Sequence, residues 1–311
     1  MADNNARVID DAEGSNVPIS PNRNRILLLG ILIGLAVPGA IFLMILFMDT
    51  RIHSRKDLMG VLSVPYLGEI PFDKDSYKRH KKQKTKSVLA KPDSIVSEAF
   101  RILRTNMAFM AKKGKPVQVI TFTSFNEGAG KTFISSNLAM TLLYARKRVI
   151  VVDLDIRKGT LSTSFAAHRG KGLTDYLVDP DMKPEDIIIR SEKGTLPDVI
   201  TAGSSAPNPA ELLMDDRLDD LFRYLRTQYD YIIADNVPVG VIADATIANR
   251  IADLTIFVVR AGRLDRRQLP DLEALYQEKK LNNMALVLNG TALKRHGYGY
   301  GYGYGYGKKK K

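Results

Sequence analysis

The sequence predicts an α/β protein in which one transmembrane helix precedes a doubly wound, mostly parallel β-sheet. Three features of the 311 residues support this fold class. Continuous apolar segments alternate with helical segments between residues 94 and 288, a glycine-containing loop joins the first such strand to its helix, and an uncharged apolar run covers residues 26–48. Apolar strands separated by helices are typical of a parallel sheet that is covered on both faces.

The predicted elements of the sheet follow one another at short intervals. Strands are expected at 117–123, 149–152, 198–202, 229–234, 254–259 and 284–288. Helices are expected at 94–111, 133–145, 211–227 and 266–280. Ligands of such sheets bind beyond the carboxyl ends of the strands. The polar side chains that fall at those ends are Lys131, Asp153, Asp155, Asp235 and Asn289.

The segment after the first strand has the composition of a phosphate-binding loop. Residues 124–132 read Ser-Phe-Asn-Glu-Gly-Ala-Gly-Lys-Thr. Backbone N–H groups of such a loop point at an anion, and glycines let the backbone approach it closely. We expect Lys131 to contact the β- and γ-phosphates of ATP and the Thr132 hydroxyl to bind Mg²⁺. The predicted nucleotide-binding residues are Asn126, Glu127, Gly128, Ala129, Gly130, Lys131, Thr132, Phe133 and Asn289.

We interpret this segment as the phosphate-binding loop of a P-loop NTPase fold. The alternative is a glycine-rich turn that precedes a helix and binds no nucleotide. The strict pattern G-x-x-x-x-G-K-[ST] has glycine where this chain has Phe125. The carboxylates at two other strand ends favour the nucleotide site. Asp235 matches the Walker-B group that holds Mg²⁺, and Asp153 and Asp155 could divide the roles of catalytic base and metal ligand. A lone Asp at a strand end is often only a helix N-cap.

Composition excludes several classes of site. The chain has no Cys, so neither a disulfide framework nor a thiolate metal site is possible. Its four histidines are scattered at no ligand spacing, which argues against zinc. The net charge is +12, and basic residues crowd positions 74–91 and 308–311. This asymmetry indicates an anionic neighbour, either lipid or nucleic acid.

The apolar run over residues 26–48 predicts a single transmembrane helix. At 1.5 Å per residue it spans the ~30 Å hydrocarbon core of a bilayer. A buried globular helix rarely stays apolar on every face for this length. More Lys and Arg residues follow the run than precede it, so the charge bias places the C-terminal part in the cytoplasm, where ATP is available.

We expect five parts in the chain: an extracytoplasmic lead-in at 1–25, the transmembrane helix at 26–48, a basic juxtamembrane linker at 49–92, the α/β domain at 93–293 and a disordered tail at 294–311. The basic core of the linker, residues 78–86, suits anionic lipids at about 1 kcal/mol for each Lys or Arg. A merely soluble linker is the alternative. Nucleic acid is not expected, because Tyr77 is the one aromatic residue beside this run.

Two further segments carry repeated chemistry. Glu98, Arg101 and Arg104 are spaced three apart and so lie nearly on one face of the helix 94–111. The simplest explanation of this spacing is ion pairing between solvent-exposed side chains. The tail alternates Gly and Tyr before four lysines, a composition that cannot build a core. It is either a low-complexity aromatic segment or a set of substrates for a tyrosine kinase. These tyrosines are Tyr298, Tyr300, Tyr302, Tyr304 and Tyr306.

Taken together, these motifs resemble the bacterial tyrosine kinases joined to polysaccharide co-polymerases of the capsular and exopolysaccharide type. The resemblance covers nearly everything from Pro18 onward. It includes the proline-flanked membrane helix and the segments 64–71 and 207–213. The family's E-x-x-R-x-x-R oligomerisation motif falls on Glu98, Arg101 and Arg104. Its D-x-D-x-R motif falls on Asp153, Asp155 and Arg157, and its terminal tyrosine cluster on the tail.

The resemblance implies an ATP- and Mg²⁺-dependent protein tyrosine autokinase in the bacterial inner membrane. Subunits would form a ring through the 98–104 helix, and the tail of one subunit would enter the site of its neighbour. Asp153 would accept the tyrosine proton, Lys131 would hold the γ-phosphate, and Thr132, Asp155 and Asp235 would hold Mg²⁺, with Arg157 at the nucleotide. Cycling of tail phosphorylation, reversed by a phosphotyrosine phosphatase, would govern polymer chain length and export through the polymerase and export machinery.

Two departures and two rival readings accompany the resemblance. The family usually has Ser or Thr and then Pro after the Walker-B Asp, where this chain has Asn236-Val237-Pro238, and Asn126-Glu127 replace a frequent Pro-Gly pair. The larger members carry a preceding periplasmic chain-length domain with an earlier membrane helix, so we expect this sequence to be either a C-terminal portion or a shortened version of such a protein. The rivals are a MinD/ParA-like membrane-associated ATPase, although its usual early loop lysine is lacking here, and an assembly adaptor without kinase activity.

Overall fold

The computed structural model describes residues 22–72, 94–111, 115–156, 159, 170–191, 194–205, 208–236, 238 and 248–292. The chain divides into two compact units, Met1–Thr50 and Arg51–Lys311. In the first unit, helix α1 (Arg23–Met48) contains the predicted apolar run. By length and composition α1 is able to cross a membrane, and among the described residues none of its most apolar stretch is buried.

The second unit is built on a seven-stranded sheet in which every pairing between neighbouring strands is parallel. The strand order is β1-β7-β6-β2-β5-β3-β4. The strands are β1 (Tyr66–Pro71), β2 (Val119–Thr123), β3 (Val149–Asp153), β4 (Asp198–Ile200), β5 (Tyr231–Asp235), β6 (Leu254–Arg260) and β7 (Met284–Thr291). The predicted fold class is confirmed.

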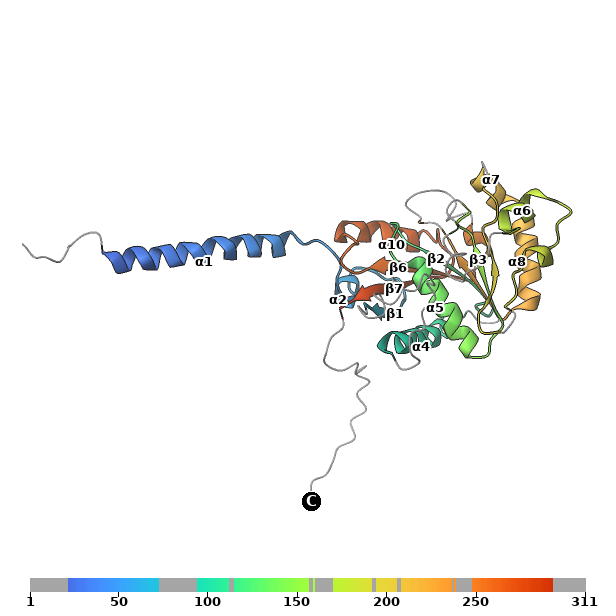
Figure 1. Ribbon diagram of the computed structural model, residues 1–311, viewed down its shortest axis with the longest axis horizontal. Helices are drawn as coiled ribbons and strands as arrows, with labels where there is room; N and C mark the ends of the chain where they lie inside the picture. Colours follow the sequence, from blue (N-terminus) through green and yellow to red (C-terminus); the bar gives the residue numbers. More distant parts are fainter. Residues whose placement is uncertain are drawn as a thin grey trace, which may run out of the picture. The chain divides into compact units, whose positions relative to one another are not determined.

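Helices cover both faces of this sheet, as its apolar strands require (Figure 1). Helices α4 (Ile95–Ala108) and α5 (Lys131–Tyr144) lie on one side, and α10 (Leu269–Gln277) lies on the other (Figure 1). Helices α6 (Leu173–Val178) and α8 (Asp216–Gln228) share a core cluster with alternate residues of β3 and β5. Because both faces are covered, β2 and β3 are buried along their whole length.

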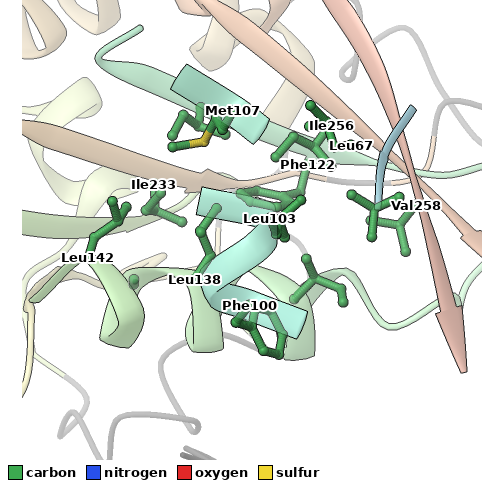
Figure 2. Close-up of a cluster of buried hydrophobic side chains, with 14 of the residues drawn as sticks. Leu67, Phe100, Leu103, Met107, Phe122, Leu138, Leu142, Ile233, Ile256 and Val258 are labelled. Atoms are coloured by element: carbon green, nitrogen blue, oxygen red, sulfur yellow. The ribbon is translucent and has the colours of Figure 1, made fainter. Parts of the chain in front are cut away.

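One layer of the core positions the helix that follows the phosphate-binding loop. Figure 2 shows Phe100 and Leu103 of α4 beside Leu138 of α5 and Phe122 of β2. All four side chains are fully buried. Helix α4 begins at a capping residue, Ser94, whose hydroxyl accepts the Ser97 N–H at 3.1 Å. Helix α5 therefore packs against both the sheet and the neighbouring helix α4, with its first turn at the carboxyl end of β2.

The structure differs from the sequence prediction at the edge of the sheet. Strand β1 and the short helix α2 (Arg55–Leu58) lie within the segment expected to be a juxtamembrane linker. The sequence of β1, Tyr-Leu-Gly-Glu-Ile-Pro, contains Gly and Pro, which are usually depleted in strands. Both are accommodated here because β1 is an edge strand with irregular register against β7. The basic core at 78–86 lies outside the described residues.

Two predicted helices are each divided into two pieces. The helix expected at 211–227 is interrupted at Asp215, where α7 (Pro209–Met214) ends and α8 begins. Asp215 adopts an extended conformation, and its carboxylate accepts the Arg217 N–H at 2.8 Å, which caps α8. The helix expected at 266–280 is a 3₁₀ turn, η4 (Arg266–Gln268), followed by α10.

The membership of β1 in the core is tested by Ile70→Ala. Ile70 is fully buried and packs in the core that also holds Phe100, so removing its side chain is expected to lower the free energy of unfolding by about 2–5 kcal/mol. Chemical denaturation with circular dichroism measures this change. Glu69→Gln, at the half-buried neighbouring position, serves as the control and should change it by about 0.5 kcal/mol or less. Equal, small effects of both substitutions would place β1 outside the cooperative unit.

Candidate active site at the carboxyl edge of the sheet

The phosphate-binding loop runs from the end of β2 to the first turn of α5. Gly128 and Gly130 have φ angles of 73° and 96°, a region that favours glycine. A Cβ atom at Gly130 would lie 2.1 Å from Asn289 Nδ2. That amide instead donates a hydrogen bond to the Ala129 carbonyl at 2.8 Å. Asn289, near the carboxyl end of β7, therefore fixes the loop at its centre, whereas the sequence predicted a contact of this residue with the nucleotide.

Phe125 occupies the position at which the strict motif has glycine. Its ring packs at an edge-on angle against Phe257 of β6, with ring centroids 5.0 Å apart. The side chain is thus partly buried against the core cluster that includes Phe257. Phe133 likewise packs inward, 6.0 Å from the Phe100 ring, so that any contact of Phe133 with a nucleotide would come from its backbone.

A short side-chain hydrogen bond joins the end of the loop to the neighbouring strand. The Thr132 hydroxyl donates a hydrogen bond to Asp235 Oδ2 at 2.6 Å. Asp235 is 2% exposed, and its other oxygen, Oδ1, is buried with no hydrogen-bond partner among the described residues. A buried carboxylate oxygen without a partner is costly unless another group satisfies it. Two of the residues predicted to hold Mg²⁺, Thr132 and Asp235, are thus in direct contact.

Burial dominates the electrostatics of this carboxylate. It raises the pKa of Asp235 to about 6. The Thr132 hydrogen bond and the positive charge of Lys131 lower that pKa in part, whereas the charge of Asp155 adds to the rise. Lys131, Thr132 and Asp155 thus all act on the same carboxyl, and the structure brings these predicted residues together.

The paired carboxylates at the end of β3 differ in exposure. Asp153 is fully buried and lies opposite Asp235 in the register of β3 and β5. Its Oδ1 accepts the Asp155 N–H at 3.2 Å. Asp155, beyond the end of the strand, is half-buried. Asp153 therefore orients the backbone of Asp155, and Asp155 is the member of the pair that solvent reaches.

A magnesium ion suits the oxygens present here. Among the described residues no group of three or more His, Cys, Asp or Glu side chains is arranged to hold a metal. Mg²⁺ usually takes one or two carboxylates together with water and substrate phosphates, so a complete protein cage is not required. The Thr132 hydroxyl and the unsatisfied Asp235 Oδ1 are oxygen donors of the right kind. These residues fit Mg²⁺ bound together with a nucleotide.

Two residues near the loop were not predicted from the sequence. The Ser124 hydroxyl donates to the Asn126 carbonyl at 2.7 Å and lies 3.5 Å from Lys131 Nζ. Arg263, in the turn after β6, places Nη1 3.4 Å from the Gly128 carbonyl oxygen. The signal that could have found Arg263 is its place just beyond the carboxyl end of a strand.

The predicted oligomerisation residues lie on α4. Arg101 pairs with Glu98 at 2.9 Å on an exposed face, as the i,i+3 spacing predicted. Arg104 instead donates to the Thr141 carbonyl of α5 at 3.3 Å. The remaining predicted residues, Arg157 and the tail tyrosines Tyr298, Tyr300, Tyr302, Tyr304 and Tyr306, lie outside the described residues.

This combination of a glycine-bearing loop, a helix whose first turn follows it and a Thr–Asp pair at parallel strand ends defines a P-loop nucleotide-binding protein. A family model described as an AAA domain matches residues 117–281. The chain is 31% identical over 214 residues to tyrosine-protein kinase YwqD of Bacillus subtilis, which is 69% of this chain and 89% of that protein. The kinase domain of Escherichia coli tyrosine kinase ETK matches 81% of this chain and all of that domain, with a TM-score of 0.69 and 28% identity.

A third relative extends the match beyond the α/β domain. A Klebsiella pneumoniae protein, whose name places it among tyrosine-protein kinases of a cps region, is 31% identical over 299 residues. Those residues are 93% of this chain but 41% of the relative, so the chain spans less than half of that protein's length. The chain belongs to the bacterial tyrosine kinase family and carries its P-loop kinase domain.

The buried carboxylate predicts a pH-dependent difference between the protein and Asp235→Asn. The pKa of Asp235 is about 6 in the folded protein and about 3.9 in an unfolded chain. Between these pH values the folded protein keeps a proton that the unfolded chain has lost, so stability falls as the pH rises through about 4 to 6. Without nucleotide or Mg²⁺, the free energy of unfolding of Asp235→Asn should therefore rise relative to that of the unaltered protein by on the order of 2–3 kcal/mol as the pH goes from 4 to 7.5.

Denaturant unfolding across this pH range measures the difference. Asp181→Asn, which removes an exposed carboxylate between α6 and the 3₁₀ turn η2 (Pro184–Ile187), is the control for the loss of one carboxylate elsewhere in the domain. A difference for Asp235→Asn that does not change with pH would mean that Asp235 is not desolvated in the folded protein.

Proposed function

We propose that this protein is a membrane-anchored, ATP-dependent tyrosine autokinase that phosphorylates the C-terminal tyrosine cluster of a neighbouring subunit. The observation that carries the proposal is the Thr132–Asp235 pair at the end of the phosphate-binding loop, in a chain of the bacterial tyrosine kinase family. Helix α1 would anchor the chain as a single-pass protein of the bacterial inner membrane, with the kinase domain in the cytoplasm.

In the proposed reaction a tyrosine oxygen attacks the γ-phosphorus of ATP, the bond from that phosphorus to the β–γ bridging oxygen breaks, and ADP leaves. Lys131 stabilises the charge on the transferring group. Thr132 and Asp235 would hold Mg²⁺, which neutralises negative charge on the phosphates when bound. The phenolic proton goes to a carboxylate of the Asp153–Asp155 pair.

Exposure favours a division of labour within that pair. An incoming tyrosine meets Asp155, because Asp153 is fully buried and its Oδ1 already accepts the Asp155 N–H. Asp155 is thus our candidate for contact with the hydroxyl, and Asp153 for orienting it. The resemblance alone had assigned the proton to Asp153.

Assembly and regulation extend the proposal to partners. Glu98, Arg101 and Arg104 would join subunits into a ring, in which the Glu98–Arg101 pair is exposed and available for exchange with a neighbour. Each phosphate adds about −1.5 to −2 charge, so a phosphorylated tail would be repelled by the carboxylates of the site. The cycle, reversed by a phosphotyrosine phosphatase, would regulate capsular or exopolysaccharide chain length and export. The basic run at 78–86 would bind anionic lipids.

Mixing two complementary variants tests transfer between subunits. Lys131→Met keeps the tail but lacks the phosphate-binding amine, and a chain ending at residue 292 keeps the site but lacks the tail. With Mg²⁺ and ATP, each alone should give no phosphotyrosine, and the mixture should label the Lys131→Met chain. Immunoblotting and mass spectrometry of the tail measure the product.

The unaltered protein with Mg²⁺ and ATP is the positive control for this mixture. Label on the unaltered chain but none in the mixture would restrict transfer to one subunit. ATP hydrolysis without phosphotyrosine in any arm would instead indicate a MinD/ParA-like ATPase, and nucleotide-dependent assembly with neither activity would indicate an adaptor.

A further inference from the structure

An arginine outside the predicted motifs lies against the phosphate-binding loop. Arg263 Nη1 is 3.4 Å from the Gly128 carbonyl oxygen. Gly128 has no side chain to prevent this approach, since a Cβ atom there would lie 2.6 Å from the same nitrogen. The guanidinium of Arg263 therefore occupies space next to the loop that only glycine at position 128 leaves open.

The turn that carries Arg263 is fixed by backbone hydrogen bonds on both sides. The Ala261 N–H donates to the Asn289 carbonyl at 2.9 Å, and Asn289 in turn holds the loop at Ala129. On the other side, the Gly262 N–H donates to the Ile52 carbonyl at 2.7 Å, and the Ile52 N–H donates to the Leu264 carbonyl at 2.9 Å. Ile52 and Leu264 are both buried. The backbone of Arg263 is thus held in place while its side chain is exposed.

The charge of Arg263 is not neutralised within the described part of the chain. Arg263 makes no ion pair there, whereas Arg266 and Arg267 of the same segment pair with Asp57 and Asp265. A guanidinium has five N–H donors in a planar fork that matches phosphate oxygens. The Gly128 carbonyl occupies one of the donors, so most of the fork remains for an anion.

From this arrangement we infer that Arg263 is a further nucleotide-binding residue, which contacts a phosphate group of the bound nucleoside di- or triphosphate. The inference rests on the proposed function only in requiring that the loop bind a nucleotide. Arg263 lies at the rim of the loop whose backbone N–H groups receive the phosphates. It reaches the loop from the turn after β6, the parallel neighbour of β2, so both segments lie at the carboxyl edge of the sheet. Its contribution is to the affinity for phosphates, not to the transfer of the γ-phosphoryl group.

Equilibrium binding of ATP, ADP and adenosine to the full chain in detergent or nanodiscs tests the inference. Arg263→Ala should weaken ATP and ADP binding about tenfold or more, because a hydrogen bond to a charged group is lost, and should leave adenosine binding unchanged. Arg263→Lys keeps the charge but not the fork and should give an intermediate loss. The melting temperature of the nucleotide-free protein should not change, which separates binding from a merely structural role.

Arg267→Ala is the matched control, since it removes the same charge from the same segment at a side chain that does not contact the loop. An equal loss in Arg267→Ala would assign the effect to general electrostatics and overturn the inference. An equal loss for adenosine would place Arg263 at the base or in the fold, and no loss for ATP would also overturn it. These are binding measurements, so their outcome is independent of the phosphotyrosine result. If nucleotide binding depended on Arg263 but the chain had no kinase activity, this inference would stand and the proposed function would be refuted.

Discussion

The hydrogen bond between Thr132 and Asp235 is the contact on which the arrangement of the site depends. It joins the first turn of α5 to the end of β5, through two residues that are 103 positions apart in the chain. The loop between β2 and α5 is therefore held at its end by a neighbouring strand and at its centre by Asn289 of β7. Strand β5 on one side of β2, and β7 beyond β6 on the other side, thus both fix one short loop, so that its N–H groups are oriented before any ligand arrives.

This fixation leaves a polar group buried in an unfavourable state. Asp235 accepts one hydrogen bond at Oδ2, and its Oδ1 has no partner among the described residues. Burial consequently raises the pKa of Asp235. A fold retains such a group when a ligand satisfies it, and a cation bound with nucleotide phosphates would do so. The buried, unsatisfied Asp235 carboxylate would then explain both the unfavourable energy of the free site and the affinity of the proposed liganded site.

The sequence predicted the interior of the sheet well, and it did so for a definite reason. Strands such as β2 and β3 are buried on both faces, so they read as continuous apolar runs, and their carboxyl ends had to meet at one edge. That reasoning located Asp235 and Asn289. It did not find β1, whose Gly and Pro suit an edge strand, or the interruption at Asp215, which depends on a side-chain cap.

The parts of the site that sequence reasoning missed depend on contacts between distant segments. The ring of Phe125, which replaces a motif glycine, packs against Phe257 of β6, and the pattern of residues 124–132 carries no sign of that contact. Arg263 approaches Gly128 from a turn 135 positions away. The differing exposure of Asp153 and Asp155 follows from the end of β3 lying in the core, which spacing alone does not specify.

The most direct test of the central claim is a double-mutant cycle on nucleotide affinity, measured in Mg²⁺ and in EDTA. Thr132→Val and Asp235→Asn each remove one half of the pair with little change of volume. If the two residues act as one unit toward Mg²⁺, each single variant should lose most of the Mg²⁺-dependent gain in ADP affinity, and the double variant should lose little more. A Mg²⁺-dependent gain that persists in both single variants, or two losses that simply add, would contradict the account.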